Sequence, residues 1–373
     1  MPPDPALTTA DVAAALTASG HPLHTWGHAL DRTPVQAARL GGDRQPAIFI
    51  AAGAHCTETA GVHAALNLVS DLETEHEVHV LPLRDPAGFA GPAHCLSLAA
   101  GEPVTLDRPD DSLAFLQRVA TLLWQEDDLY LFQLGHVGFV WAPPEPGLDT
   151  FWRQFALTGR LPRECPDAIA PLRDRSIFFI NVNSDIEGSG ALQRCYHTVL
   201  SRDNEWLHLN RFFGRPDAPP EVAAVDELVR TVRPGLTIDL HEGNGAGFWM
   251  PIPRPLSDRP DGDATLAFDM TRAFFTYIRE KGYPVETYEH WRATNGIEAA
   301  DPDWMVPEPR LTGLFWLQQG RRQEGPNLMT YAARFGLGYG TEGPMELPLA
   351  TRVDGLTRGI QRAIATWERG QVS

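Results

Sequence analysis

The chain alternates between short apolar runs and longer stretches in which apolar residues recur every three or four positions. The short runs predict buried strands and the periodic stretches predict helices. The expected strands cover residues 46–53, 77–83, 128–134, 176–183, 236–240 and 337–341. The expected helices cover residues 9–16, with Thr9 as the cap, and 61–72, 111–125, 221–232, 263–279 and 353–368. Strand, helix and strand in succession form a crossover unit, so we predict an α/β fold with a mixed, largely parallel sheet flanked by helices.

Three segments lack a clear pattern. Residues 17–45 read as a polar connection, residues 135–174 carry six prolines, and residues 286–327 have the character of a loop. We expect these segments to be irregular. Because no repeat or linker divides the chain, we expect a single domain over residues 1–373.

Composition limits the classes of partner. Hydrophobic residues make up 43% and charged residues 21% of the chain, as in an ordinary soluble globular protein. A net charge of −17 argues against binding to nucleic acid or to an anionic membrane. The N-terminus lacks the features of a signal peptide, and the four cysteines are scattered, which favours reduced thiols and a cytoplasmic location.

Polar side chains that suit a metal follow three of the predicted strands. His55 and Glu58 come after residues 46–53, His241 follows residues 236–240, and Glu342 follows residues 337–341. The carboxyl ends of parallel strands meet at one edge of a sheet, where ligands bind. Two histidines and a carboxylate suit one Zn²⁺ ion with an open coordination position, and a further glutamate can act as general base. Glu346 is the rival to Glu342, although it lies past Pro344.

The sequence resembles the zinc metallocarboxypeptidases, the carboxypeptidase A-like peptidases, together with the related aspartoacylase and succinylglutamate desuccinylase branch. The matching stretches, in the family's order, are Gly53–Glu58, Leu209–Phe213, Asp239–His241 and Thr341–Glu342. The resemblance implies that His55, Glu58 and His241 bind zinc and that Glu342 is the catalytic base. It also implies that Asn210 and Arg211 hold a substrate carboxylate and that a further arginine polarises the scissile carbonyl. We assign that last role to Arg202, with Arg194 as the alternative.

The chain also departs from the family pattern. The Asn-Pro-Asp-Gly turn is incomplete both at 83–89 and at 181–185, and neither Tyr288 nor Tyr331 is clearly the mobile active-site tyrosine. Asn210 follows Glu58 by 152 residues (210 − 58), which is longer than the pattern leads us to expect. We therefore predict an insertion at about residues 90–175.

Three functions compete at this point. The first is a zinc metallocarboxypeptidase that acts on peptides, and the second is an amidohydrolase of N-acyl amino acids. Only 31 residues follow Glu342 (373 − 342), too few for the additional β-rich domain expected of the deacylase branch, which favours the first. A metal-free binding protein is the third and requires the motif residues to coincide by chance. The sequence predicts neither the substrate side chain nor the oligomeric state.

Overall fold

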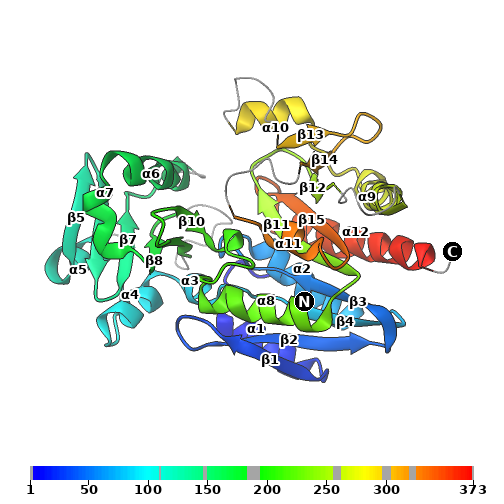
Figure 1. Cartoon of the computed structure of the whole chain (residues 1–373), viewed down its shortest axis with the longest axis horizontal. Helices are drawn as coiled ribbons and strands as arrows, with labels where there is room; N and C mark the ends of the chain where they lie inside the picture. Colours follow the sequence, from blue (N-terminus) through cyan, green and yellow to red (C-terminus); the bar gives the residue numbers. More distant parts are fainter. Residues whose placement is uncertain are drawn as a thin grey trace.

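Six strands form the central sheet of the molecule (Figure 1). The computed structural model describes residues 3–108, 111–145, 149–182, 194–254, 262–295, 304–318 and 325–371. The four strands β4, β3, β11 and β15 run parallel, and β1 and β2 extend them as an antiparallel hairpin at one edge. In spatial order the strands are β1 (Leu23–His28), β2 (Pro34–Gly41), β4 (His76–Leu81), β3 (Arg44–Ala51), β11 (Leu236–Gly243) and β15 (Leu337–Pro344).

Helices cover both faces of the central sheet, and this explains the continuous apolar runs in its strands. One face packs against α1 (Thr9–Ala18), α2 (Thr59–Asp71), α9 (Gly262–Glu280) and α12 (Leu349–Gly370). The other packs against α8 (Pro220–Val232) and α11 (Leu328–Ala332). The mixed, largely parallel sheet flanked by helices is as predicted. None of the described helices is long and apolar enough to cross a membrane.

A second sheet of six strands lies beside the first, drawn in cyan to green in Figure 1, and most of its strand pairs are antiparallel. Its spatial order is β10 (Trp206–His208), β9 (Tyr196–Leu200), β8 (Arg175–Phe179), β7 (Val137–Trp141), β6 (Leu129–Leu134) and β5 (Thr121–Glu126). Its faces pack against α4 (Pro92–Ala100) and α5 (Asp111–Val119), and against α6 (Asp149–Glu164) and α7 (Pro166–Ile169). Much of this unit falls within the predicted insertion, whose status as an insertion stays a prediction.

Short elements complete the described fold. The helix α3 (Pro86–Ala90) follows β4, and the 3-10 turns η1 (Ala170–Leu172) and η3 (Leu209–Arg211) follow α7 and β10. A three-stranded sheet consists of β12 (Met250–Pro253), β14 (Leu314–Leu317) and β13 (Met305–Pro307). It packs with α10 (Tyr288–Thr294) around an aromatic cluster.

Several local predictions were wrong, mostly in segments where strand pairing or packing overrides the local pattern. The expected helix at 111–125 ends at Val119, and Trp124 lies in β5 because that segment pairs with β6. Residues 17–45 contain the hairpin β1–β2, and the two segments expected to be irregular contain β7, α6, α7, α10, β13 and β14. Thr8, rather than Thr9, caps α1 through a capping box with Asp11.

The close packing of α12 on α9 depends on a residue without a side chain. A Cβ atom at Gly359 of α12 would lie 2.4 Å from atoms of the Phe274 ring of α9. We expect Gly359→Ala to destabilise the protein by about 1–3 kcal/mol, because the helices or the ring must shift. Equilibrium unfolding in urea measures this change.

Gly159 provides the matched control. It is exposed in the middle of α6, and an added Cβ would meet no atom within 4 Å. Gly159→Ala should therefore be neutral or stabilise the protein by up to about 1 kcal/mol, because alanine favours helix. Equal destabilisation by both substitutions would contradict the packing argument.

Candidate active site

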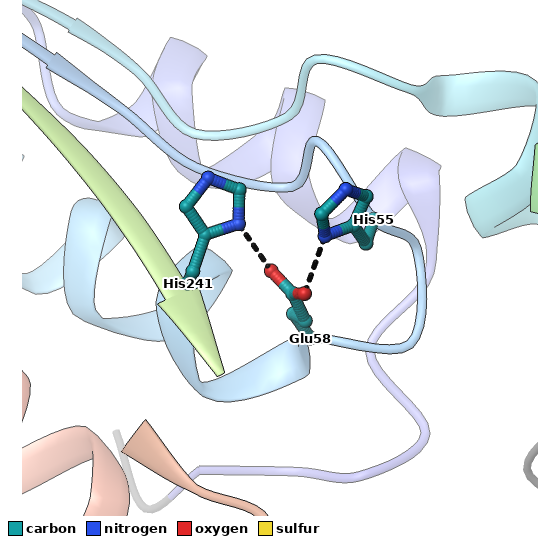
Figure 2. Close-up of side chains that lie close together, drawn as sticks. All are labelled: His55, Glu58 and His241. Atoms are coloured by element: carbon teal, nitrogen blue, oxygen red, sulfur yellow. Dashed lines mark hydrogen bonds and ion pairs between the residues drawn. The ribbon is translucent and has the colours of Figure 1, made fainter. Parts of the chain in front are cut away.

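Three side chains that could bind a metal converge where β3 and β11 end. His55 lies in the turn after β3, Glu58 is the residue immediately before α2, and His241 is on β11. β3 and β11 are neighbours in parallel register, so their carboxyl ends open on the same edge. Figure 2 shows the Glu58 carboxylate between the two imidazole rings. We call these three residues the His-Glu-His cluster.

Each oxygen of Glu58 contacts one histidine. His55 Nδ1 lies 2.5 Å from Glu58 Oε1, and His241 Nδ1 lies 2.8 Å from Glu58 Oε2. The side chains of Glu58 and His241 are 6% and 4% exposed, and that of His55 is 14% exposed. Two imidazole nitrogens and a carboxylate therefore face one point at the edge of the sheet.

This donor set fits a zinc ion. Nitrogen from two histidines and oxygen from one carboxylate is a set that catalytic zinc sites use, and three ligands leave one coordination position open. The ligand atoms of the cluster all lie within 4.8 Å of one another. The structure thus brings together the three residues predicted as zinc ligands.

A buried network holds His241 from behind. His241 Nε2 lies 2.8 Å from Asp239 Oδ2, which also accepts a hydrogen bond of 3.2 Å from the Asn210 amide. Arg84 donates to the other oxygen of Asp239 at 2.8 Å and to Asn210 Oδ1 at 2.9 Å. With its Nε2–H directed to Asp239, His241 presents Nδ1 to the cluster, as a metal ligand requires.

An imidazole, rather than a carboxylate, supports His55. His55 Nε2 lies 2.9 Å from His208 Nδ1 on β10, and the Tyr196 ring of β9 stacks on His55 at 5.4 Å between centroids. Both supports come from the second sheet. The orientation of His55 therefore depends on how that sheet packs against the central one.

Electrostatics in the cluster keep the carboxylates charged. Burial alone would raise the pKa of Glu58, but the adjacent His55 and His241 outweigh it and lower that pKa. Burial would likewise lower the pKa of His241, and Asp239 and Glu58 instead raise it well above the ordinary value. Asp239 has a lowered pKa because His241 and Arg84 outweigh its burial. The site is therefore built to hold positive charge next to Glu58.

Glu342 lies beside His241 on the neighbouring strand. The two residues are partners in the parallel register of β11 and β15, and Glu342 lines the cavity described next. Loss of hydration raises the pKa of Glu342 to about 8, with nearby carboxylates adding to the effect and His241 opposing it. Glu346, the alternative base, is exposed and does not line the cavity.

A cavity of about 380 Å³ opens over the cluster. Its walls come from the central sheet, the second sheet and the small third sheet. Aromatic side chains dominate them: Phe151, Trp152, Phe155, Tyr196, Trp249, Trp291 and Trp304. Among the described residues that line it, Arg211 is the only arginine. The cavity therefore combines aromatic wall residues with one arginine and with the histidines and glutamates around the cluster.

The predicted clamp residues have different surroundings. Asn210 lines the cavity, but its amide oxygen already accepts from Arg84 and, at 3.0 Å, from the backbone N–H of Leu328. Arg211 is 7% exposed and donates to the Asn210 carbonyl at 3.2 Å. Asn210 thus ties β11 to the chain around Arg211, whereas Arg211 is placed to meet a ligand.

The two candidates for the polarising arginine lie elsewhere. The Arg202 side chain is 76% exposed and pairs with Asp174 at 2.8 Å, in a separate surface depression. Arg194 is buried, donates to the backbone carbonyls of Phe89 and Leu7, and stacks on the Phe89 ring. Neither lines the cavity, so the geometry does not support the role predicted for Arg202.

Sequence reasoning assigned no role to Arg84, Asp239, His208 and Tyr196. Asp239 had a detectable signal, because it stands two residues before His241 on a strand and so faces the same side. His208 lies on a strand of three residues, too short to give a pattern. Tyr288 and Tyr331 are buried outside the cavity, and the tyrosine that lines it is Tyr196.

The raised pKa of Glu342 predicts an effect of pH on the metal-free protein. The folded-state value of about 8 exceeds the ordinary value of 4.5, so ionisation costs the folded state stability as the pH rises between them. Glutamine cannot ionise, and Glu342→Gln should therefore melt about 2 °C or more above the chelator-treated wild type at pH 8. The difference should be near zero at pH 5. Thermal melts across this range measure it.

Glu346→Gln is the control for this measurement, since Glu346 is exposed near the same strand end. Its melting temperature should follow that of the wild type at every pH. A constant difference between Glu342→Gln and the wild type from pH 5 to pH 8 would show that the Glu342 carboxyl is not desolvated.

Comparison with known proteins supports the fold independently. No protein-family model and no curated protein sequence matches the chain. Among solved structures, a metallo-carboxypeptidase from Burkholderia cenocepacia aligns with a TM-score of 0.50 and 12% identity, over 97% of this chain and 70% of that one. Carboxypeptidase A from Helicoverpa armigera aligns with a TM-score of 0.49 and 11% identity, over 98% and 73% of the two chains. The first of these alignments shows that the chain shares its fold with that metallo-carboxypeptidase.

Proposed function

We propose that this protein is a zinc-dependent hydrolase that cleaves an amide bond next to a free carboxylate, most simply a metallocarboxypeptidase. One observation carries the proposal: the His-Glu-His cluster and Arg211 line the same cavity, with Glu342 beside them. A metal-binding set, a base and a cation for a carboxylate are the groups that such a reaction needs. The likeness of the fold to a metallo-carboxypeptidase agrees with this combination.

Each protein group has a separate task in the proposed reaction. His55, Glu58 and His241 would hold a zinc ion, which would supply Lewis acidity and bring the pKa of water toward neutrality. Glu342 accepts a proton from the attacking water and passes it to the departing amine. Its carboxylate must be ionised for the first step, and a divalent cation nearby favours that form. Asp239 keeps His241 in the tautomer that offers Nδ1.

Arg211 is assigned the substrate carboxylate. A guanidinium remains charged at all working pH values and can bind a carboxylate through two hydrogen bonds. It is buried at the cavity wall, where such a pair is stronger than at the surface. Asn210 is assigned a supporting role, because its side chain already bonds to Arg84, Asp239 and Leu328.

The cavity walls favour an apolar side chain in the substrate. Phe151 and Phe155 contribute from α6, and Trp249 and Trp291 from the opposite wall. Burying an aliphatic or aromatic side chain against these rings is favourable by about 25 cal/mol per Å² of apolar area. A peptide with a C-terminal aromatic or large aliphatic residue is therefore the substrate to test first.

The proposal also includes a reducing, cytoplasmic environment. All four cysteines are unpaired, and Cys56, Cys95 and Cys195 are buried. Free buried thiols of this kind are typical of proteins that fold where disulfides do not form.

Replacing the base should separate metal binding from catalysis. Glu342→Gln keeps the shape of the side chain but cannot accept a proton. We expect kcat to fall by about 10²–10⁴-fold while the zinc content equals that of the wild type. Activity on a C-terminally free peptide and metal analysis of the same preparation measure both. Full activity in this variant would move the base to another residue.

Replacing the clamp should abolish discrimination between substrates. Arg211→Met should lower kcat/KM for a peptide with a free C-terminus by about 30-fold or more, because the buried carboxylate loses its partner. The amidated peptide should be cleaved equally poorly by both proteins. Arg202→Met is the control and should change kcat/KM less than about twofold, since its surface ion pair contributes little.

The same assay separates the two reactions proposed from the sequence. Cleavage of N-acyl amino acids without cleavage of peptides would assign the protein to the amidohydrolases. Equal cleavage of the free and amidated peptides by the wild type would contradict the role of Arg211.

A further inference from the structure

A second group of possible metal ligands lies away from the cavity, formed by Asp85, His197 and Glu221. Asp85 follows β4 and caps α3, His197 is on β9 of the second sheet, and Glu221 is in the first turn of α8. Their exposed fractions are 0%, 2% and 1%, so all three are buried. None of them lines the active-site cavity. We call these residues the buried acid-histidine cluster.

The protein leaves most of the polar atoms in this cluster without a partner. Asp85 Oδ1 accepts from the Gly88 backbone N–H at 3.1 Å. By contrast, Asp85 Oδ2, both oxygens of Glu221 and His197 Nε2 have no hydrogen-bond partner among the described residues. Burial raises the pKa of Glu221 above its ordinary value, although His197 and the backbone N–H groups of Leu30 and Glu221 oppose this rise. No hydrogen bond of normal geometry reaches either oxygen. A buried carboxylate in this state is costly, and native structures rarely tolerate one.

Charge in the cluster is also unbalanced. Two carboxylates face one imidazole, so with both carboxylates ionised even a protonated His197 would leave a net negative charge in the interior. Otherwise one carboxyl must stay protonated, as the raised pKa of Glu221 indicates. A third acid, Asp31, also acts on His197 from nearby. A divalent cation would balance the two carboxylates with His197 neutral.

The distances distinguish a metal ion from a shared proton. His197 Nδ1 lies 3.2 Å from Asp85 Oδ1 and 3.3 Å from Glu221 Oε1. Charge-assisted hydrogen bonds would be shorter, at about 2.7–2.9 Å. Zinc bonds of about 2.0–2.2 Å in tetrahedral geometry place neighbouring ligand atoms roughly 3.3–3.6 Å apart. The 3.3 Å spacing falls within this second range, and the 3.2 Å spacing lies just below it and also permits a long hydrogen bond between His197 and Asp85. His197 Nε2 is unpaired in both arrangements and does not decide between them.

We propose that Asp85, His197 and Glu221 form a structural zinc site, separate from the His-Glu-His cluster, with a second oxygen of Asp85 or Glu221 as the fourth ligand. Its ligands come from the central sheet, the second sheet and α8, so one ion would join three parts of the fold. Such an ion would also affect the active site, because Tyr196 is the residue next to His197. Tyr196 points to the opposite side of β9 and stacks on His55, so fixing His197 also fixes a support of the active site.

Metal analysis of the zinc-replete wild type tests the proposal without depending on a variant. We expect two zinc ions per chain, and anomalous diffraction at the zinc edge should show one peak at each cluster. Glu221→Gln should remove one ion and its peak while the other remains. Asp31→Asn is the control: it removes a buried acid that also acts on His197, but Asp31 binds His94 and is not one of the three ligands, so this variant should retain both ions.

The melting temperature gives an independent test, because the difference between Glu221→Gln and the wild type should change sign when zinc is removed. With zinc, Glu221→Gln should melt several degrees below the wild type, because it loses a bound ion. After chelation the order should reverse, since the variant no longer buries an uncompensated carboxylate. A higher melting temperature for the variant under both conditions would overturn the proposal.

The location of the bound zinc tells failure of the structural site apart from failure of the proposed hydrolase function, on which the structural site does not depend. Zinc only at the His-Glu-His cluster would overturn the structural site and leave the hydrolase proposal standing. Zinc only at the buried acid-histidine cluster would overturn the hydrolase proposal and leave the structural site standing. Absence of zinc from both would overturn both.

Discussion

Parallel register among β3, β11 and β15 is the constraint on which the candidate site depends. Because β11 lies between the other two strands, the turn after β3 and the end of β15 both open beside His241. Side chains alternate along a strand, so a slip of one residue in β11 would turn His241 and Asp239 to the opposite face together. The helices on both faces of the sheet fix this register, since every residue from Leu236 to Glu242 is buried.

Strand register places His241, and the buried charges of Asp239 and Arg84 then fix the orientation of its ring. Asp239 is fully buried, and its pairing with Arg84 keeps that carboxylate charged where it contacts His241. A buried pair of this kind adds little net stability, but removing one partner costs about 3–5 kcal/mol, because the other charge is then left uncompensated. Arg84 also reaches Asn210, so the same guanidinium links the central sheet to the segment that carries Arg211. The network therefore holds His241, a proposed metal ligand, and the segment of Arg211, the proposed substrate clamp, as one unit.

The second sheet completes the site from the other side. Its strands β9 and β10 supply Tyr196 and His208 against His55, and its helix α6 supplies aromatic residues to the cavity wall. An imidazole as the support of His55 differs from the carboxylate that supports His241, so the two histidines of the cluster have unlike surroundings. The long passage between Glu58 and Asn210 is thus part of the active-site architecture rather than a separate appendage.

The sequence by itself determined the parallel strands of the central sheet and the placement of the His-Glu-His cluster at their carboxyl ends. Continuous apolar runs identify the strands around residues 48, 238 and 339, and strand order places His55, Glu58, His241 and Glu342 at one edge, because parallel strands share the direction of their carboxyl ends. Only the tertiary structure decided the rest. β1, β2, β5 and β10 are short or partly exposed strands whose pairing depends on distant segments, and Arg202 could be separated from the cavity only by knowing where its loop packs. The buried acid-histidine cluster joins residues 85, 197 and 221, and no local pattern connects positions so far apart.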